Sequence, residues 1–227
     1  MKKHRECRPE TPQMLANQLH DGRWKKAKHL AKIEEKLLEI YSSKNDRLIV
    51  NMPPRHGKSE LITKIFPLWW LINKPSDRII ISTYNSKLSE YFGREILDNF
   101  KRIASDYELA LNNSQKSKSE FVTNKNGSIT AVGVGGTLTG KGTDLIIVDD
   151  PIKNDKEANS ETRRDSLMEW FNATLLTRLE PGGSVVLVMT RWHEDDLAGR
   201  LLQSTDWDSL IFPAITTKPD ELGREVG

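Results

Sequence analysis

Two kinds of hydrophobic pattern alternate along this chain. Short apolar runs rich in β-branched residues predict buried strands at 47–52, 78–83, 144–150, 183–191 and 207–215. Longer segments with apolar residues three or four positions apart predict helices at 27–41, 58–72, 87–103, 160–179 and 195–203. Buried strands that alternate with helices are typical of an α/β fold. We therefore predict a mainly parallel sheet with helices on both faces.

Local breakers and polar stretches refine this picture. Pro67 predicts a kink or a division in the helix at 58–72. The Asn126-Gly127 pair predicts a tight two-residue hairpin turn with positive φ angles. The polar and basic stretch 112–120 predicts a loop, and the polar, proline-containing residues 1–23 predict a loosely ordered start.

Composition restricts the class of protein less than the pattern does. At 227 residues the chain can bury one substantial core, and its 34 basic and 32 acidic side chains nearly balance. The single cysteine, Cys7, excludes an internal disulfide and a multi-cysteine zinc site and suits a reducing compartment. The longest apolar run, 65–72, is too short to cross a bilayer, and no apolar segment follows the basic start as in a secretory signal.

The segment RLIVNMPPRHGKSELI at 47–62 carries the first candidate site. It matches the phosphate-binding pattern G-x-x-x-x-G-K-[ST] in the expected context of a strand before and a helix after, although Met52 stands in place of the first glycine. The residues predicted to bind a nucleotide are Pro54, Arg55, His56, Gly57, Lys58, Ser59 and Glu60. Lys58 is expected to reach the phosphates and Ser59 to bind Mg²⁺, while the alternative is a chance G-K-S in a turn.

A strand that ends in acids supplies the second half of such a site. In LIIVDDP, Asp149 is expected to hold Mg²⁺ and Asp150 to orient and deprotonate the attacking water. The alternative is an exposed acidic turn before Pro151. Because both motifs occur in the correct order, the sequence predicts that the chain hydrolyses ATP, with Asp150, Arg55 and Lys58 as the catalytic residues.

Four further features of the sequence bear on its function or fold. Thr190, at the end of a third buried strand, is predicted to sense the γ-phosphate, and Lys141 is a second candidate cation beside Arg55. The HEDD sequence at 193–196 superficially resembles a metal site, but we expect its acids to cap the next helix. Trp69, Trp70 and Trp170 lie at helical positions that predict burial.

Together these segments resemble the ATPase domain of the large terminase subunit of tailed bacteriophages. The resemblance rests on LIVNMPPRHGKSE, GTLTGKGTDLIIVDDPIKN, TLLTRLEPGGSVVLVMTRWHEDDLAGRLL and FPAI. It implies a P-loop NTPase fold of the ASCE type over residues 29–227, preceded by a polar and basic segment at 1–28. It also implies that ATP hydrolysis, with Mg²⁺ as cofactor, moves double-stranded DNA into a procapsid.

The same resemblance implies partners and a location. These are a portal protein, a small terminase subunit and further copies of the chain in a ring, usually a pentamer, in the host cytoplasm during virion assembly. No membrane is expected to take part. Nothing in the sequence matches the family's ribonuclease-H-like nuclease, so no DNA cleavage is expected.

Carried onto this sequence, the family pattern implies roles for particular residues. Arg55 resembles the phosphate-loop arginine, and Thr190 falls in the coupling motif. Two positions depart from the pattern: Asp150 stands where many members have glutamate, and Lys141 stands where many have an arginine that reaches a neighbouring subunit. Lysine lacks the bidentate fork of arginine, so the resemblance supports a trans-acting Lys141 only in part.

Two other functions remain open on the sequence alone. The chain could be a helicase or another nucleic-acid translocase with the same ATP site, or an assembly module that binds ATP with little turnover alone. A further hypothesis places DNA phosphates against Lys116 and Lys118 in the basic stretch at 112–120.

Overall fold

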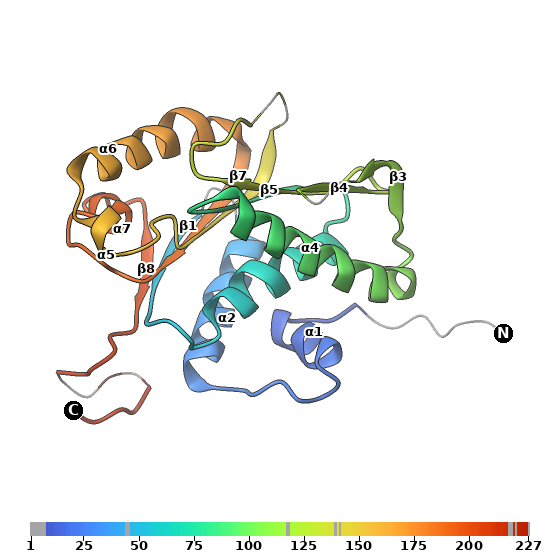
Figure 1. The fold of residues 1–227 in the computed structure, drawn as a ribbon. Helices are drawn as coiled ribbons and strands as arrows, with labels where there is room; N and C mark the ends of the chain where they lie inside the picture. The colour runs from blue at the N-terminus through green and yellow to red at the C-terminus, as the bar shows by residue number, and fades with distance from the viewer. Residues whose placement is uncertain are drawn as a thin grey trace.

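The computed structural model is built around one eight-stranded sheet with helices on both faces (Figure 1). The structure describes residues 8–43, 46–116, 119–138, 140, 142–217, 220 and 222–226. The strand order is β3-β4-β5-β2-β6-β7-β1-β8. The six strands from β5 to β8 in this order run parallel, while β3 and β4 are antiparallel at one edge. The predicted α/β fold with a mainly parallel sheet is confirmed.

The elements follow one another in the order strand, helix, strand over most of the chain. The strands are β1 (Arg47–Asn51), β2 (Arg78–Thr83), β3 (Leu111–Lys116), β4 (Glu120–Thr123), β5 (Ser128–Gly133), β6 (Thr143–Asp149), β7 (Leu179–Met189) and β8 (Asp208–Ile211). The α-helices are α1 (Pro12–Leu19), α2 (Lys28–Ser42), α3 (Phe66–Asn73), α4 (Ser86–Ile103), α5 (Asp155–Ala158), α6 (Glu161–Trp170) and α7 (Leu197–Leu201). Shorter turns of other helix types are η1 (Ser59–Ile65), η2 (Ala104–Tyr107), η3 (Phe171–Leu175) and η4 (Leu176–Arg178).

The order of the central strands decides where a site can form. β7 lies between β1 and β6, with Asn51 opposite Met189 and Asp149 opposite Val188. Because these three strands are parallel, the segments that follow them emerge at the same edge of the sheet. Ligands bind at the carboxyl ends of strands in sheets of this kind.

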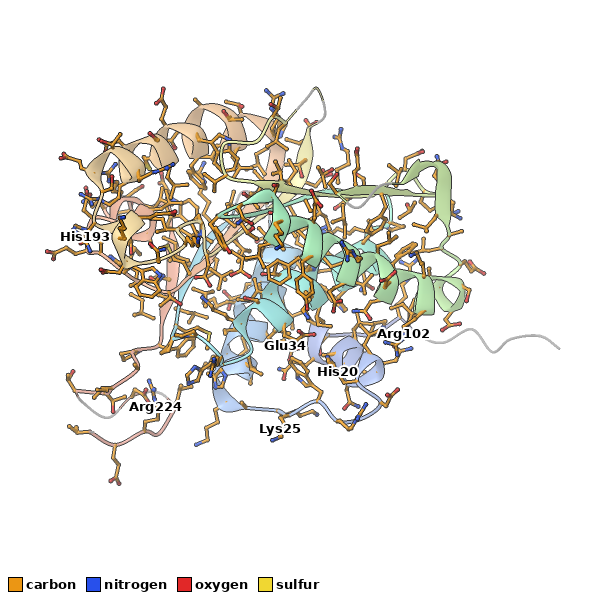
Figure 2. The ribbon with its side chains drawn as sticks, viewed as in Figure 1. His20, Lys25, Glu34, Arg102, His193 and Arg224 are labelled. Atoms are coloured by element: carbon orange, nitrogen blue, oxygen red, sulfur yellow. The ribbon has the colours of Figure 1, made fainter. Side chains whose placement is uncertain are left out.

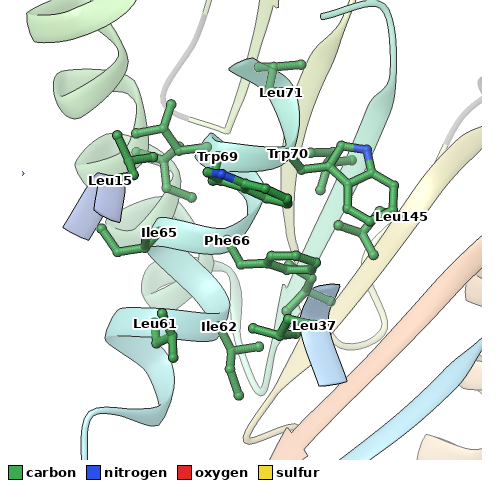
Figure 3. Close-up of a cluster of buried hydrophobic side chains, with 14 of the residues drawn as sticks. Leu15, Leu37, Leu61, Ile62, Ile65, Phe66, Trp69, Trp70, Leu71 and Leu145 are labelled. Atoms are coloured by element: carbon green, nitrogen blue, oxygen red, sulfur yellow. The ribbon is translucent and has the colours of Figure 1, made fainter. Parts of the chain in front are cut away.

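Two apolar cores cover the two faces of the sheet. The larger one packs α1, α2, η1, α3 and α4 against one face, and the other packs α5, α6, α7 and η3 against the opposite face (Figure 1). In the larger core Phe66, Trp69 and Trp70 of α3 lie among Leu37 of α2 and Leu145 of β6 (Figure 3). The predicted burial of Trp69, Trp70 and Trp170 is confirmed, since they are 2%, 3% and 9% exposed.

The predicted division of the helix at Pro67 is confirmed as well. The segment begins as the π-helical η1, and the Phe66 N–H bonds to Leu61 O, five residues earlier. α3 then starts at Phe66 with Pro67 in its first turn. A proline is tolerated there because the first N–H groups of a helix have no partner inside it.

Two predictions for polar segments are wrong. Residues 12–19, expected to be loosely ordered, form α1, whose Leu15 and Ala16 are fully buried. The start of the expected loop at 112–120 belongs to β3, which pairs with β4 at the sheet edge. The backbone ladder of an edge strand can form without an apolar side-chain pattern, and residues 111–116 lack such a pattern, so β3 could not be predicted from it.

The helix expected over 160–179 is also shorter than predicted. α6 ends at Trp170 and continues as the wider π-helical turn η3 and the tighter 3-10 turn η4 before β7 begins at Leu179. Leu167, Phe171 and Leu175 are nonetheless buried as their spacing predicts. The chain therefore keeps the apolar face but changes its helical pitch as it approaches the sheet.

The predicted hairpin around Asn126 and Gly127 is present, with a longer turn than expected. β4 and β5 are joined by residues 124–127, and of this pair Asn126 alone has a positive φ, of 67°. Gly127 is required for another reason, because a Cβ there would lie 2.3 Å from the carbonyl oxygen of Pro75. Its N–H donates to that same oxygen at 3.1 Å.

We expect Gly127→Ala to destabilise the fold by about 2 kcal/mol or more, since backbone atoms would have to move to admit the methyl group. Gly135→Ala is the comparison: its φ is +78° but a Cβ there meets open space, so only the strain of about 1–2 kcal/mol for a left-handed residue applies. Urea unfolding of the two variants measures the difference. Equal destabilisation would show that the close approach of Pro75 does not matter.

Candidate functional site

The loop after β1 is held by its apolar first residue. Met52, in the place of the usual glycine, is 4% exposed and packs in the larger core. The next residues lie at the surface: Pro54, Arg55 and His56 are exposed. Arg55 and Gly57 have φ angles of 65° and 83°, which turn the backbone sharply before η1 begins. A large residue is therefore tolerated at position 52 because its side chain points into the core rather than into the loop.

Lys58 connects this loop to the acids at the end of β6. Its Nζ donates to both carboxylate oxygens of Asp150, at 2.7 and 2.6 Å, and to Thr190 Oγ1 at 3.0 Å. The Thr190 N–H donates to Asp150 Oδ1 at 2.8 Å. The carboxyl ends of β1, β6 and β7 thus contribute one side chain each to a single cluster. The Lys58 side chain is 5% exposed and that of Asp150 is 33% exposed, so the acid is open to water while the cation is covered.

Asp150 adopts an unusual backbone conformation at this position. Its φ is 43°, in the left-handed region that few residues other than glycine adopt, although aspartate tolerates it better than most. Its N–H still bonds to Val188 O of β7 at 2.9 Å, which continues the strand ladder by one residue. Backbone strain of this kind is concentrated at functional sites, where the surrounding structure maintains it.

Asp149 lies deeper, at the last position of β6. The residue is 1% exposed, and its Oδ2 accepts a hydrogen bond of 2.6 Å from the hydroxyl of Thr63. Its Oδ1 is buried and has no hydrogen-bond partner. Burial and the nearby charge of Asp150 raise the pKa of Asp149 to about 6, against the opposing effects of Thr63, Lys58 and Ser59.

The donors around Asp149 fit Mg²⁺. Among the described residues no three His, Cys, Asp or Glu side chains gather into a metal site. Mg²⁺ is usually held by one or two carboxylates, water and the phosphates of a substrate, so a fuller set of protein ligands is not needed. The Ser59 hydroxyl and the unpartnered Oδ1 of Asp149 are hard oxygen donors of the right kind.

Of the remaining predicted residues, Glu60 lies next to Ser59 on η1. Glu60 pairs with Lys64 one turn along the helix, and its other oxygen lies 3.3 Å from His20 Nε2. Lys141 lies outside the described residues, as does Lys118, and the side chain of Lys116 is likewise not described. Their predicted roles stay predictions.

An aromatic group that the sequence pattern does not predict lies beside the loop after β1. His29 of α2 lies edge-on to His56 and to Phe212, with ring centres 6.0 and 6.4 Å away. His29 Nε2 also contacts His56 O at 2.9 Å. Phe212 follows β8, and its N–H bonds to Asn51 O at the end of β1. Only the strand order reveals this group, since its members are far apart in sequence.

Residues 191–196, which follow Thr190, form a turn that ion pairs and a helix cap hold in place; we call it the braced turn. As predicted, one of its acids caps the next helix. Asp196 is fully buried and caps α7 by accepting from the Gly199 N–H at 2.9 Å, and its other oxygen accepts from Arg191 Nε at 2.8 Å. Asp195 lies between Arg200 of α7 and Arg164 of α6, and these two cations hold its pKa well below the ordinary range. Figure 2 shows His193 of this turn beside α5 and α7, far from Arg102 on α4.

A cavity of about 720 Å³ lies elsewhere, over β2 and β5. Arg78, Tyr84 and Glu120 are among its lining residues, which include none of the cluster formed by Lys58, Asp149, Asp150 and Thr190. In that cluster Lys58 and Asp149 are buried, while the Asp150 side chain is partly exposed. We place the candidate site there because that is where the charged groups of both motifs meet.

Comparisons with known proteins show the family to which the chain belongs. The family model described as the N-terminal part of the T4-like large terminase subunit matches residues 49–221, which include both motifs and the braced turn. The chain belongs to the large terminase subunit family. No curated protein sequence is significantly similar to the chain.

Two solved structures show the same fold at low sequence identity. The ATPase domain of the large terminase from Thermus phage P74-26 is 13% identical, with a TM-score of 0.55, over 82% of this chain and 71% of that one. The large terminase of bacteriophage HK97 is 14% identical, with a TM-score of 0.55, over 80% of this chain. The match spans 38% of the HK97 terminase chain. Among the described residues no helix is long and apolar enough to cross a membrane.

The raised pKa of Asp149 makes a prediction about stability. A carboxyl group that binds its proton more tightly when folded opposes folding once it ionises. The Asp149 carboxyl therefore lowers the free energy of unfolding, and this effect grows as the pH rises from about 4 to about 6 and stays constant above that. We expect Asp149→Asn to raise the stability of the nucleotide-free protein at pH 8 by on the order of 1–3 kcal/mol and to lose this advantage near pH 4.

Urea unfolding at several pH values in the presence of EDTA measures this effect. Asp144→Asn is the control, since Asp144 also lies on β6 but is partly exposed at the opposite end of the strand. The raised pKa of Asp149 is refuted if Asp149→Asn is less stable than the parent protein at pH 8. It is also refuted if the difference in unfolding free energy between the two proteins does not change with pH.

Proposed function

We propose that this chain is the ATPase motor part of a large terminase subunit, which hydrolyses ATP to drive double-stranded DNA into a procapsid. The observation that supports the proposal most directly is the contact of Lys58 with Asp150 and Thr190. The contact joins one residue each of the predicted phosphate loop, the predicted acid pair and the predicted γ-phosphate sensor in one hydrogen-bonded cluster.

Binding would use groups that the loop already presents. Backbone N–H groups at residues 57–59, at the start of η1, would face the phosphates, and the helix dipole favours negative charge there. Lys58 would exchange the Asp150 carboxylate for the β- and γ-phosphate oxygens. Ser59 and Asp149 would hold Mg²⁺, which when bound neutralises phosphate charge and orients the triphosphate.

This exchange would free Asp150 for its catalytic role. The oxygen of a water molecule attacks the γ-phosphorus, the bond from that phosphorus to the β–γ bridging oxygen breaks, and Asp150 accepts the proton of the water. Thr190 would contact the γ-phosphate, and Arg55, exposed in the loop, would neutralise charge that develops in the transition state. The carboxylate of Asp150 is already partly open to water.

The braced turn offers a route from the site to the helices. Thr190 contacts Lys58, the next residue Arg191 holds Asp196, and Asp195 joins α7 to α6 through Arg200 and Arg164. A displacement of Thr190 on loss of the γ-phosphate would therefore move charged contacts on both helices. We propose that this movement acts on bound DNA. Further copies of the chain would form a pentameric ring on a portal protein, together with a small terminase subunit. Lys141 would act on the site of the neighbouring copy.

One observation favours a second candidate function, that of an assembly module which binds ATP with little turnover. Both oxygens of Asp150 accept from Lys58, and Oδ1 accepts from Thr190 as well, so the proposed base is engaged until a nucleotide displaces the lysine. An isolated chain in this state would bind ATP with little turnover, as an assembly module does. Phosphate release measured against protein concentration separates the two, because completion of the site by a neighbour makes release rise more than linearly.

Substitutions at the cluster test the proposed hydrolysis. We expect Lys58→Ala and Asp150→Asn each to lower turnover at least about 100-fold, since one removes a phosphate cation and the other the base. Asp150→Asn keeps the size of the side chain and should retain ATP binding, whereas Lys58→Ala should weaken it. Phosphate release and ATP affinity are the two measurements.

Lys101→Ala is the matched control, because Lys101 is an exposed lysine of α4 that pairs with Asp98 and should not affect turnover. Wild-type turnover in Asp150→Asn would refute its role as the base. Unchanged affinity and turnover in Lys58→Ala would refute the whole assignment of the site.

A further inference from the structure

The hydroxyl of Thr63 is a buried polar group that neither motif includes. Thr63 is fully buried in η1, where Leu61, Ile62 and Ile65 are also fully buried. Its neighbours in the sequence are thus core residues, and a valine of the same shape would fill this place without a polar atom. Packing alone therefore does not explain why this position carries a hydroxyl group.

The contact that the hydroxyl makes is specific. A threonine inside a helix commonly donates to the carbonyl of its own preceding turn. Thr63 donates instead to Asp149 Oδ2 on β6, 86 positions away in the sequence, at 2.6 Å. A short bond from a hydroxyl to a carboxylate is of the stronger, charge-assisted kind.

This bond leaves the two oxygens of Asp149 with different surroundings. Oδ2 is held by Thr63 inside the core, while Oδ1 is buried but has no hydrogen-bond partner. Ser59 lies one turn before Thr63 on η1 and acts on the same carboxylate. The helix thus brings two hydroxyls to Asp149: that of Thr63, which is fully buried and donates to Oδ2, and that of Ser59, which is partly exposed.

We propose that Thr63 is a positioning residue: it fixes the Asp149 carboxylate so that Oδ1 is presented, beside Ser59, to a divalent cation. The proposal rests on the proposed nucleotide site. Groups that hold a metal ligand in place typically contribute a factor of 10–100 to metal affinity or activity. Thr63 would not touch the nucleotide or the cation, so its effect should appear only in the part of nucleotide affinity that depends on Mg²⁺.

The test measures ADP affinity by calorimetry, once in EDTA and once in excess Mg²⁺. We expect Thr63→Val to bind ADP in EDTA as the parent chain does and to lose about 10-fold or more of the gain that Mg²⁺ gives. Thr63→Ser keeps the hydroxyl and should restore the gain. Thr143→Val is the matched control, because Thr143 is an equally buried threonine of β6 whose hydroxyl donates to Arg78 O and Leu145 O.

The possible results are distinct. The inference is overturned if Mg²⁺ strengthens ADP binding equally in the parent chain and in Thr63→Val, or if Thr143→Val loses the gain to the same extent. If the parent chain binds no ADP, the proposed function fails and the inference fails with it. Thermal melting checks that each variant folds, and Thr63→Ala is a second variant without the donor should Thr63→Val not fold.

Discussion

The ion pair between Lys58 and Asp150 is the interaction on which the site depends. It joins two segments 92 positions apart in the sequence, and it forms only because β7 separates β1 and β6 by a single strand. A nearly buried lysine needs a partner, since an unpaired charge in a covered position is strongly unfavourable. Asp150 is that partner here, and a triphosphate could replace it with more negative charge in the same place.

The two neighbouring acids are held in contrasting surroundings. Asp150 is partly open to water, bonded to a cation and strained in its backbone, whereas Asp149 is buried and shares no ion pair with Lys58 in the described contacts. Different environments can move the pKa values of two neighbouring carboxyl groups apart, so that one can hold a cation while the other accepts a proton. Asp149 and Asp150 are thus adjacent residues of the same type in different surroundings.

Much of the fold and half of the site follow from the sequence, for physical reasons. Buried parallel strands must be continuously apolar, and phosphate binding demands glycine, lysine and a hydroxyl at fixed spacing, so β1, β6 and the residues Gly57 to Ser59 are visible in the pattern. Of the acids of the HEDD sequence, which were predicted to cap the next helix, Asp196 caps α7, while Asp195 pairs with Arg164 and Arg200.

Other features could not be predicted because they depend on contacts between distant segments. Thr63 looks like one more core position until β6 is placed beside it, and the group of His29, His56 and Phe212 exists only once α2 and β8 flank the phosphate loop. α1 is different, because its signal was present and was missed. Thr11 caps it and Pro12 begins it, which is a recognisable start of a helix.

The most direct test of the account is a crystal structure of this chain with Mg²⁺ and a non-hydrolysable ATP analogue. The account predicts that Lys58 Nζ leaves Asp150 and lies about 3 Å from oxygens of the β- and γ-phosphates. A nucleotide bound elsewhere, such as in the cavity over β2 and β5, with the Lys58–Asp150 pair intact, would contradict it.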